Sequence, residues 1–224
     1  MKTKLLAFHN KKSIKDAYIA RVKAHYEADE IIKGRYWENG KGCAVGCTIH
    51  GNSHDAYPRE LGISWRIALI EDSLFENLKN SEAKKFPLQF LQSVPVGGDT
   101  ELAYKKFVIW VLGDKKEGLV NVVKNENKKY LLQRILNLYK KSLKIEIEQE
   151  EWKKLADEAT SAYASAYASA SAYAYASAYA YVSASAYASA YAPAYASASP
   201  VWNEIFDERI IAMRDKLLSL LKKC

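Results

Sequence analysis

Apolar residues recur every three or four positions along most of the chain, which is the spacing of one face of an α-helix. A first such stretch follows Ser13, a good capping residue, and reaches Gly34, a natural helix end. Later stretches begin at the capping residue Ser64 and at Asp99 or Thr100. The expected helices are 13–34, 64–78, 100–113, 130–143 and 200–221, with shorter segments marked by Pro58, Ser81 and Pro87.

Strand patterns are weak, so we predict an all-α fold built as a helical bundle. The chain divides into a helical domain at 1–147, an Ala/Tyr/Ser repeat helix at 148–199 and an amphipathic helix at 200–224. Pro200 suits the first turn of that last helix, because proline fixes a helical φ and lacks only an N–H that would be unpaired there. We expect the last helix to fold back onto the helical domain.

Residues 162–197 form three units of twelve residues in which alanine alternates with tyrosine or serine. The alternation would suit a silk-like strand, whereas the alanine content favours a helix. An acidic, helix-forming segment precedes the tract, and turn residues are missing from it, so we predict one long Ala-rich helix from about Glu148 to Ala192. Its tyrosines would spiral around a rod about 65 Å long. The tract is then either an inert spacer or the surface of a homo-oligomer.

The 224 residues carry 33 basic and 26 acidic side chains, a net charge of +7. The basic side chains are spread as lysine pairs, which is typical of a solvated surface, so any contact with nucleic acid would be non-specific. The sequence contains no run of apolar residues that suits a membrane span. The apolar stretch near residue 5 is too short for the core of a signal peptide, so we expect none. Three cysteines make no disulfide framework in a chain of this length, so we expect a cytoplasmic protein with reduced thiols.

The densest group of reactive side chains lies in a glycine-rich segment between the first two helices. It contains Cys43, Cys47, His50 and His54. Thiolate and imidazole are zinc ligands, and spacings of four residues occur between paired ligands, so this set predicts a zinc site. The short gap from Cys47 to His50 is wrong for a zinc finger.

Geometry limits how this set could bind one ion. On a straight helix Cys43 and His54 would lie about 16 Å apart along the axis, too far for a shared metal. Either the chain folds back at Gly46 or Gly51, or only a pair such as His50 and His54 binds. The other ligands would then come from elsewhere; His25, Asp29 and Glu60 are candidates.

Two other interpretations of this segment stay open. The cysteines could be small buried apolar residues and the histidines packed loop residues. Alternatively Cys43, following Lys41 at a helix start, could be a nucleophilic thiol with His25 or His50 as its base. The sequence has no phosphate-binding glycine loop and no nucleophile elbow. Cys224 is expected to be an exposed thiol without a special function.

The string YWENGKGCAVGCTIH at 36–50, followed by His54, Tyr57 and the ELGI at 60–63, resembles a group of uncharacterised bacterial and phage proteins. The resemblance runs from about Ala17 to Val111 and again in the alanine-rich part. In those relatives the tail mixes alanine with charged residues, where this chain has serine and tyrosine. The resemblance implies that residues 25–60 are the working region and that the protein is phage-associated; it implies no mechanism.

Three functions are compatible with these features. The first is a small intracellular binding or regulatory protein, with a protein partner, whose Cys/His loop holds zinc. The second is an enzyme that uses the Cys43 thiol or a metal-activated water. The third is an assembly protein that associates through the tyrosine–alanine repeat.

Overall fold

The computed structural model describes residues 4–116, 118–163 and 200–224. These residues are mostly helical and include two short strands, so the predicted all-α class is confirmed. Most of the predicted repeat helix, at 164–199, lies outside the described residues. Within the described ranges, no helix is both long enough and apolar enough to cross a bilayer.

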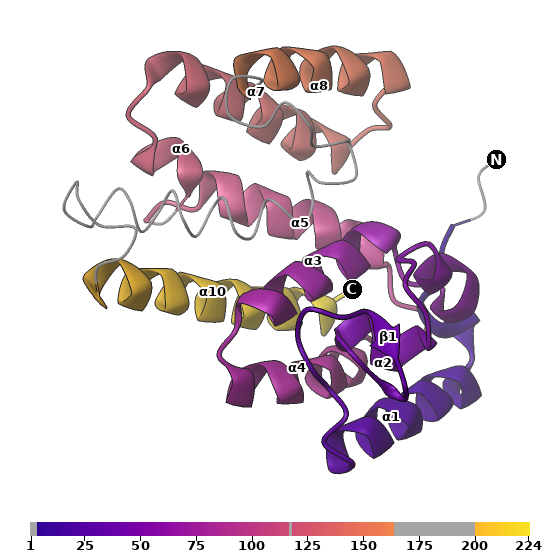
Figure 1. Cartoon of the computed structure of the whole chain (residues 1–224). Coiled ribbons are helices and arrows are strands. Elements are labelled where there is room, and N and C mark those ends of the chain that lie inside the picture. Colours follow the sequence, from indigo (N-terminus) through magenta and orange to yellow (C-terminus); the bar gives the residue numbers. More distant parts are fainter. Residues whose placement is uncertain (1–3, 117, 164–199) are drawn as a thin grey trace.

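Seven longer helices are found among the described residues (Figure 1): α1 (Lys12–Glu27), α3 (Trp65–Asn77), α4 (Asn80–Ser93), α5 (Thr100–Gly113), α7 (Glu126–Ser142), α8 (Gln149–Tyr163) and α10 (Pro200–Leu221). The shorter elements are the 3-10 turn η1 (Ala7–Asn10), α2 (Ala44–Ile49), the π-helical turn η2 (Tyr57–Leu61) and α6 (Leu119–Val122). Strands β1 (Trp37–Glu38) and β2 (Lys41–Gly42) pair as an antiparallel hairpin just before α2.

Several helix starts follow from side-chain caps. The Ser64 hydroxyl accepts the N–H of Arg66, and the Asp99 carboxylate accepts the N–H of Leu102, so both predicted caps are confirmed. Pro200 is the first residue of α10, also as predicted. An Asn125 cap starts α7 four residues before Tyr130, earlier than the apolar pattern indicated.

Helices α1 and α4 also differ from the expectation. Helix α1 ends at Glu27 and not at Gly34, because Asp29 takes a left-handed conformation (φ 55°) and Ile31 then pairs with Gly42 as a short bridge. Pro87 neither opens nor ends a segment, since α4 continues through it. Buried neighbours of the proline on the same helix, Phe86 and Phe90, anchor α4 in the core.

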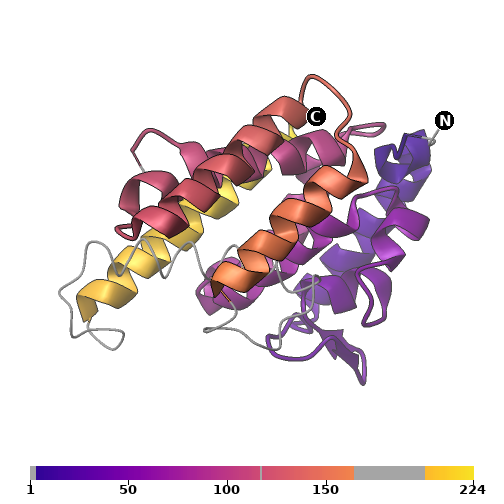
Figure 2. The same ribbon diagram turned by 90° about the horizontal axis from the view of Figure 1, so that it is seen from above.

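One apolar core joins the elements, including those from the far end of the sequence. Helix α10 contributes buried side chains of Ile210, Met213, Leu217 and Leu221 and packs against α3, α4 and α5. The expected return of the C-terminal helix is therefore confirmed, and Figure 1 shows α10 running alongside α5. In Figure 2, α8 lies beside α7, which packs on α5.

The segment before the hairpin lies on α2 at unusually short range. The Tyr36 carbonyl accepts the Cys43 N–H at 3.2 Å. A Cβ added to Gly42 would lie 2.0 Å from that carbonyl oxygen, and one added to Gly46 would lie 1.3 Å from it. Only glycine permits this approach of two backbone segments.

We expect Gly46→Ala to destabilise the fold by about 3 kcal/mol, because the new methyl group would collide with backbone that cannot rotate away. The sign of this change in unfolding free energy is informative, since alanine normally stabilises a helix position by about 1 kcal/mol relative to glycine. Urea unfolding of both proteins measures the difference. Gly51→Ala is the matched control, because its Cβ would make ordinary contacts beginning at 3.6 Å; equal effects of the two changes would contradict the steric argument.

Candidate functional site

Two groups of polar side chains lie on the hairpin–α2 unit, which packs against α1 and α3. The first group is centred on Cys43, the residue that caps α2. Its sulfur accepts the Gly46 N–H at 3.5 Å, and the residue is only 2% exposed. Cys43 is thus fixed at the start of a short helix, as the sequence suggested.

Helix α3 brings two carboxylates to this thiol. Asp72 and Glu76 are one turn apart on the same face, and one ligand atom from each lies within 4.8 Å of the other and of the Cys43 sulfur. Both Glu76 oxygens accept the Gly34 N–H at 3.1 Å. Asp72 Oδ1 is buried and has no hydrogen-bond partner among the described residues.

His54 and Tyr36 complete this group at the other Asp72 oxygen. His54 Nε2 lies 3.1 Å from Asp72 Oδ2, and the Tyr36 hydroxyl donates to the same oxygen at 3.4 Å. The two rings meet edge to face with centroids 5.8 Å apart. We call Cys43, Asp72 and Glu76, with their neighbours His54 and Tyr36, the thiol–carboxylate cluster.

The charges in this cluster oppose ionisation of the thiol. Burial and then the Asp72 carboxylate raise the pKa of Cys43 far above that of a free cysteine. Burial also raises the pKa of Glu76, with a further contribution from Asp72, while the Gly34 N–H and Lys33 act in the opposite direction. The position of Cys43 matches the nucleophile hypothesis, but its electrostatic surroundings hold the thiol protonated.

The second group links His50, at the end of α2, to His25 of α1. His25 Nδ1 lies 2.6 Å from a Glu30 carboxylate oxygen, and His25 Nε2 lies 2.8 Å from His50 Nε2. The Trp37 indole stacks on the His50 imidazole with centroids 4.3 Å apart and an interplanar angle of 16°. We call His25, His50, Glu30 and Trp37 the histidine pair cluster.

Cys47 belongs to neither the thiol–carboxylate cluster nor the histidine pair cluster. Its buried thiol lies 3.3 Å from the Gly42 carbonyl and 3.8 Å from that of Glu30. Burial raises the pKa of Cys47 to about 12, which suits a structural thiol that packs and donates to backbone.

The four predicted zinc ligands are therefore divided. Cys43 and His54 meet at Asp72, His50 turns to His25, and Cys47 points at backbone carbonyls. The physical reason is the length of α2, which has six residues and ends where His50 becomes left-handed (φ 50°). A straight helix through all four residues does not form, because the chain leaves the helix at His50, next to Gly51.

Sequence reasoning missed the two carboxylates on α3. Their signal was the spacing of Asp72 and Glu76, four residues apart and so on one face of the predicted helix. Among the additional candidates, His25 does meet His50, whereas Asp29 pairs with Lys84 and Glu60 accepts the Tyr18 hydroxyl.

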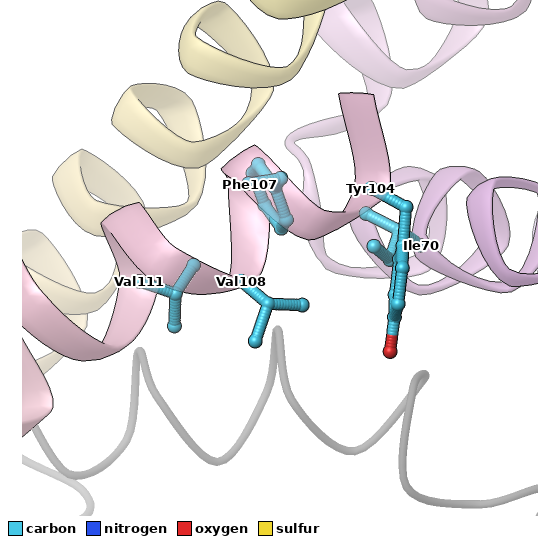
Figure 3. Close-up of a pocket in the computed structure, with 5 residues that line it drawn as sticks. All are labelled: Ile70, Tyr104, Phe107, Val108 and Val111. Carbon is cyan, nitrogen blue, oxygen red and sulfur yellow. The ribbon is translucent and has the colours of Figure 1, made fainter. Parts of the chain in front are cut away.

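An apolar hollow elsewhere carries none of this chemistry. It is lined by Ile70, Tyr104, Phe107, Val108 and Val111 of α3 and α5 (Figure 3). Its one polar side chain, Tyr104, forms a hydroxyl–hydroxyl hydrogen bond with Tyr139 at 3.0 Å. No protein family, curated protein or solved structure matches this chain, so the two clusters are interpreted from their own geometry.

We expect iodoacetamide to alkylate Cys43 and Cys47 much more slowly in the folded protein than in denaturant at the same pH. Burial blocks access, and the raised pKa values leave little thiolate at neutral pH. Mass spectrometry of peptides from a time course measures each thiol separately. Fast, selective alkylation of Cys43 in the native protein would contradict this and would favour the nucleophile hypothesis.

Proposed function

We propose that this protein is a metal-binding module that holds one divalent transition-metal ion, zinc being the best fit, at Cys43, Asp72 and Glu76. The observation that carries the proposal is the convergence of a thiol and two carboxylates within 4.8 Å from two separate helical segments. Three groups that can each become anionic are costly to gather in a partly buried place unless a cation balances them.

The unpartnered Asp72 Oδ1 supports the same conclusion. Buried carboxylate oxygens normally find a donor, and none of the described residues supplies one here. The other oxygen, Oδ2, is held by His54 and Tyr36, as ligating carboxylates usually are. A thiolate ligand selects zinc or another soft ion over magnesium and calcium.

The number of ligands favours a second candidate function within the same site. Structural zinc sites have four protein ligands, whereas catalytic sites keep one position for water. The Cys43, Asp72 and Glu76 set has three, and the neighbouring Tyr36 is 41% exposed, so solvent reaches this side of the cluster. A metal held there would lower the pKa of a bound water and support hydrolysis.

The experiment is metal analysis of untagged protein together with cobalt substitution. We expect close to one zinc ion per chain and, after cobalt replaces it, a near-ultraviolet band from sulfur-to-cobalt charge transfer. Cys43→Ser should abolish the band and weaken metal binding by at least about 100-fold, because a first ligand matters more than the outer partners, whose loss costs about 10–100-fold.

Cys47→Ser is the matched control, since Cys47 is an equally buried thiol on the same helix that lies against backbone carbonyls. It should keep both the band and the metal. His54→Gln should weaken binding by about 10–100-fold and leave the band in place, as expected of an outer partner. A band that survives in Cys43→Ser and disappears in Cys47→Ser would overturn the assignment.

Self-association through the repeat stays a prediction, because residues 164–199 lie outside the described part of the chain. If the repeat is the interface, deleting residues 162–197 should lower the subunit count measured by sedimentation. An unchanged count would remove the assembly function. A protein partner, a phage association and a cytoplasmic location also stay predictions.

A further inference from the structure

The histidine pair cluster is separate in its residues from the thiol–carboxylate cluster, and its geometry identifies a hydrogen bond. The two Nε2 atoms lie 2.8 Å apart and the ring centroids 5.0 Å apart. The centroid separation exceeds the separation of the two nitrogens by about twice the radius of an imidazole ring. Both Nε2 atoms therefore lie close to the line that joins the ring centres, and each points at the other ring. Two ligands of one metal would instead point to a third position off that line. A single proton therefore lies between His25 and His50.

The partners fix where the remaining protons go. An ionised Glu30 carboxylate only accepts, so Nδ1 of His25 carries a hydrogen. Neutral His25 then has a bare Nε2, which must accept the Nε2–H of His50. This leaves Nδ1 of His50 as a bare acceptor, and no described residue donates to it. His25 has a side chain only 12% exposed, whereas His50 is exposed.

We propose that His50 is a general base that takes a proton at Nδ1 from a bound anionic substrate or its attacking water, with His25 and Glu30 as positioning residues. When Nδ1 accepts the proton, His50 becomes an imidazolium whose Nε2–H stays bonded to His25. The Glu30 charge, relayed through His25, stabilises that cation. The indole of Trp37 holds the ring plane by stacking.

The charges around His50 indicate the substrate class. Arg21, one turn before His25 on α1, donates to the Thr48 carbonyl at 2.8 Å, two residues before His50. Burial, and then the charges of Arg21 and His25, lower the pKa of His50, which favours the neutral imidazole that can accept a proton. Glu60 on η2 acts in the opposite direction, and its carboxylate is occupied by the Tyr18 hydroxyl at 2.6 Å. A base beside a guanidinium suits a phosphate-like oxyanion.

Diethyl pyrocarbonate, which acylates neutral imidazole, tests the base directly. His9 is the internal control, because it is an exposed histidine whose Nε2 contacts the Arg59 carbonyl and no second imidazole. We expect His50 to be modified faster than His9 in the wild-type protein. Glu30→Gln should slow His50 by about tenfold and move the pH midpoint of its modification, while His9 keeps its rate.

Inorganic phosphate tests the substrate class. It should slow modification of His50 in the wild type, have no effect on His50 in Arg21→Gln, and leave His9 unchanged in both. Circular dichroism verifies that the variants are folded, and the wild-type comparison of His50 with His9 needs no variant. Equal modification rates at both histidines would overturn the assignment of His50 as a general base. A pH midpoint of His50 that does not change in Glu30→Gln would also overturn it. If phosphate does not protect His50 from modification, the proposal that the substrate is an anion is overturned.

This inference does not depend on the metal. Cys43→Ser should leave the modification of His50 unchanged, so failure of either proposal is visible without the other. A loss of His50 reactivity in that variant would contradict the separation of the two clusters.

Discussion

The contact between the Tyr36 carbonyl and the two glycines of the hairpin–α2 unit determines where both clusters lie. Gly42 and Gly46 let the backbone of residues 35–37 rest directly on α2, where Cys43 donates to it. Successive side chains of an extended segment point to opposite sides. Tyr36 therefore reaches Asp72 and His54, while Trp37 reaches His50 and His25. The close approach of residues 35–37 to α2 thus gives Tyr36 to the thiol–carboxylate cluster and Trp37 to the histidine pair cluster.

The two clusters differ in how their charge is balanced. In the thiol–carboxylate cluster, burial and the Asp72 charge favour the protonated forms of Cys43 and Glu76, and a cation would replace those protons. In the histidine pair cluster, a carboxylate already balances any added proton, and its outer member faces solvent. The first arrangement is suited to binding an ion and the second to accepting and releasing a proton. Both chemistries fit on one short helix because its two ends face different neighbours, α3 and α1.

Local signals in the sequence were sufficient for most of the fold. The Ser64 and Asp99 caps, Pro200 at the start of α10 and the apolar periodicity all depend on neighbouring residues, so a single sequence reveals them. The end of α1 was harder to predict from the sequence, because Asp29 adopts a left-handed conformation and no glycine marks that position. The pairing of Ile31 with Gly42 that follows is a tertiary event.

The candidate site was predictable only in part, for the same reason. The cysteines and histidines were visible as a dense group, but which of them face one another depends on a helix of only six residues and on the loop after it. The carboxylates that meet Cys43 come from a helix some thirty positions later in the chain, and no local spacing connects Asp72 to Cys43. His25 was expected as a further metal ligand or as a base for Cys43, and its hydrogen bond with His50 was not predicted.

His50 ends α2 in a strained conformation that its contacts with neighbouring rings stabilise. As the residue that ends α2 it is left-handed, with φ 50° and ψ 47°, which costs a non-glycine residue about 1–2 kcal/mol. Stacking on Trp37 returns about 0.5–1.5 kcal/mol, and the hydrogen bond to His25 a similar amount. Together these contributions, about 1–3 kcal/mol, offset the conformational cost. Glycine would end the helix without strain but would make neither contact, so the imidazole is what connects the end of α2 to Trp37 and to His25 on α1.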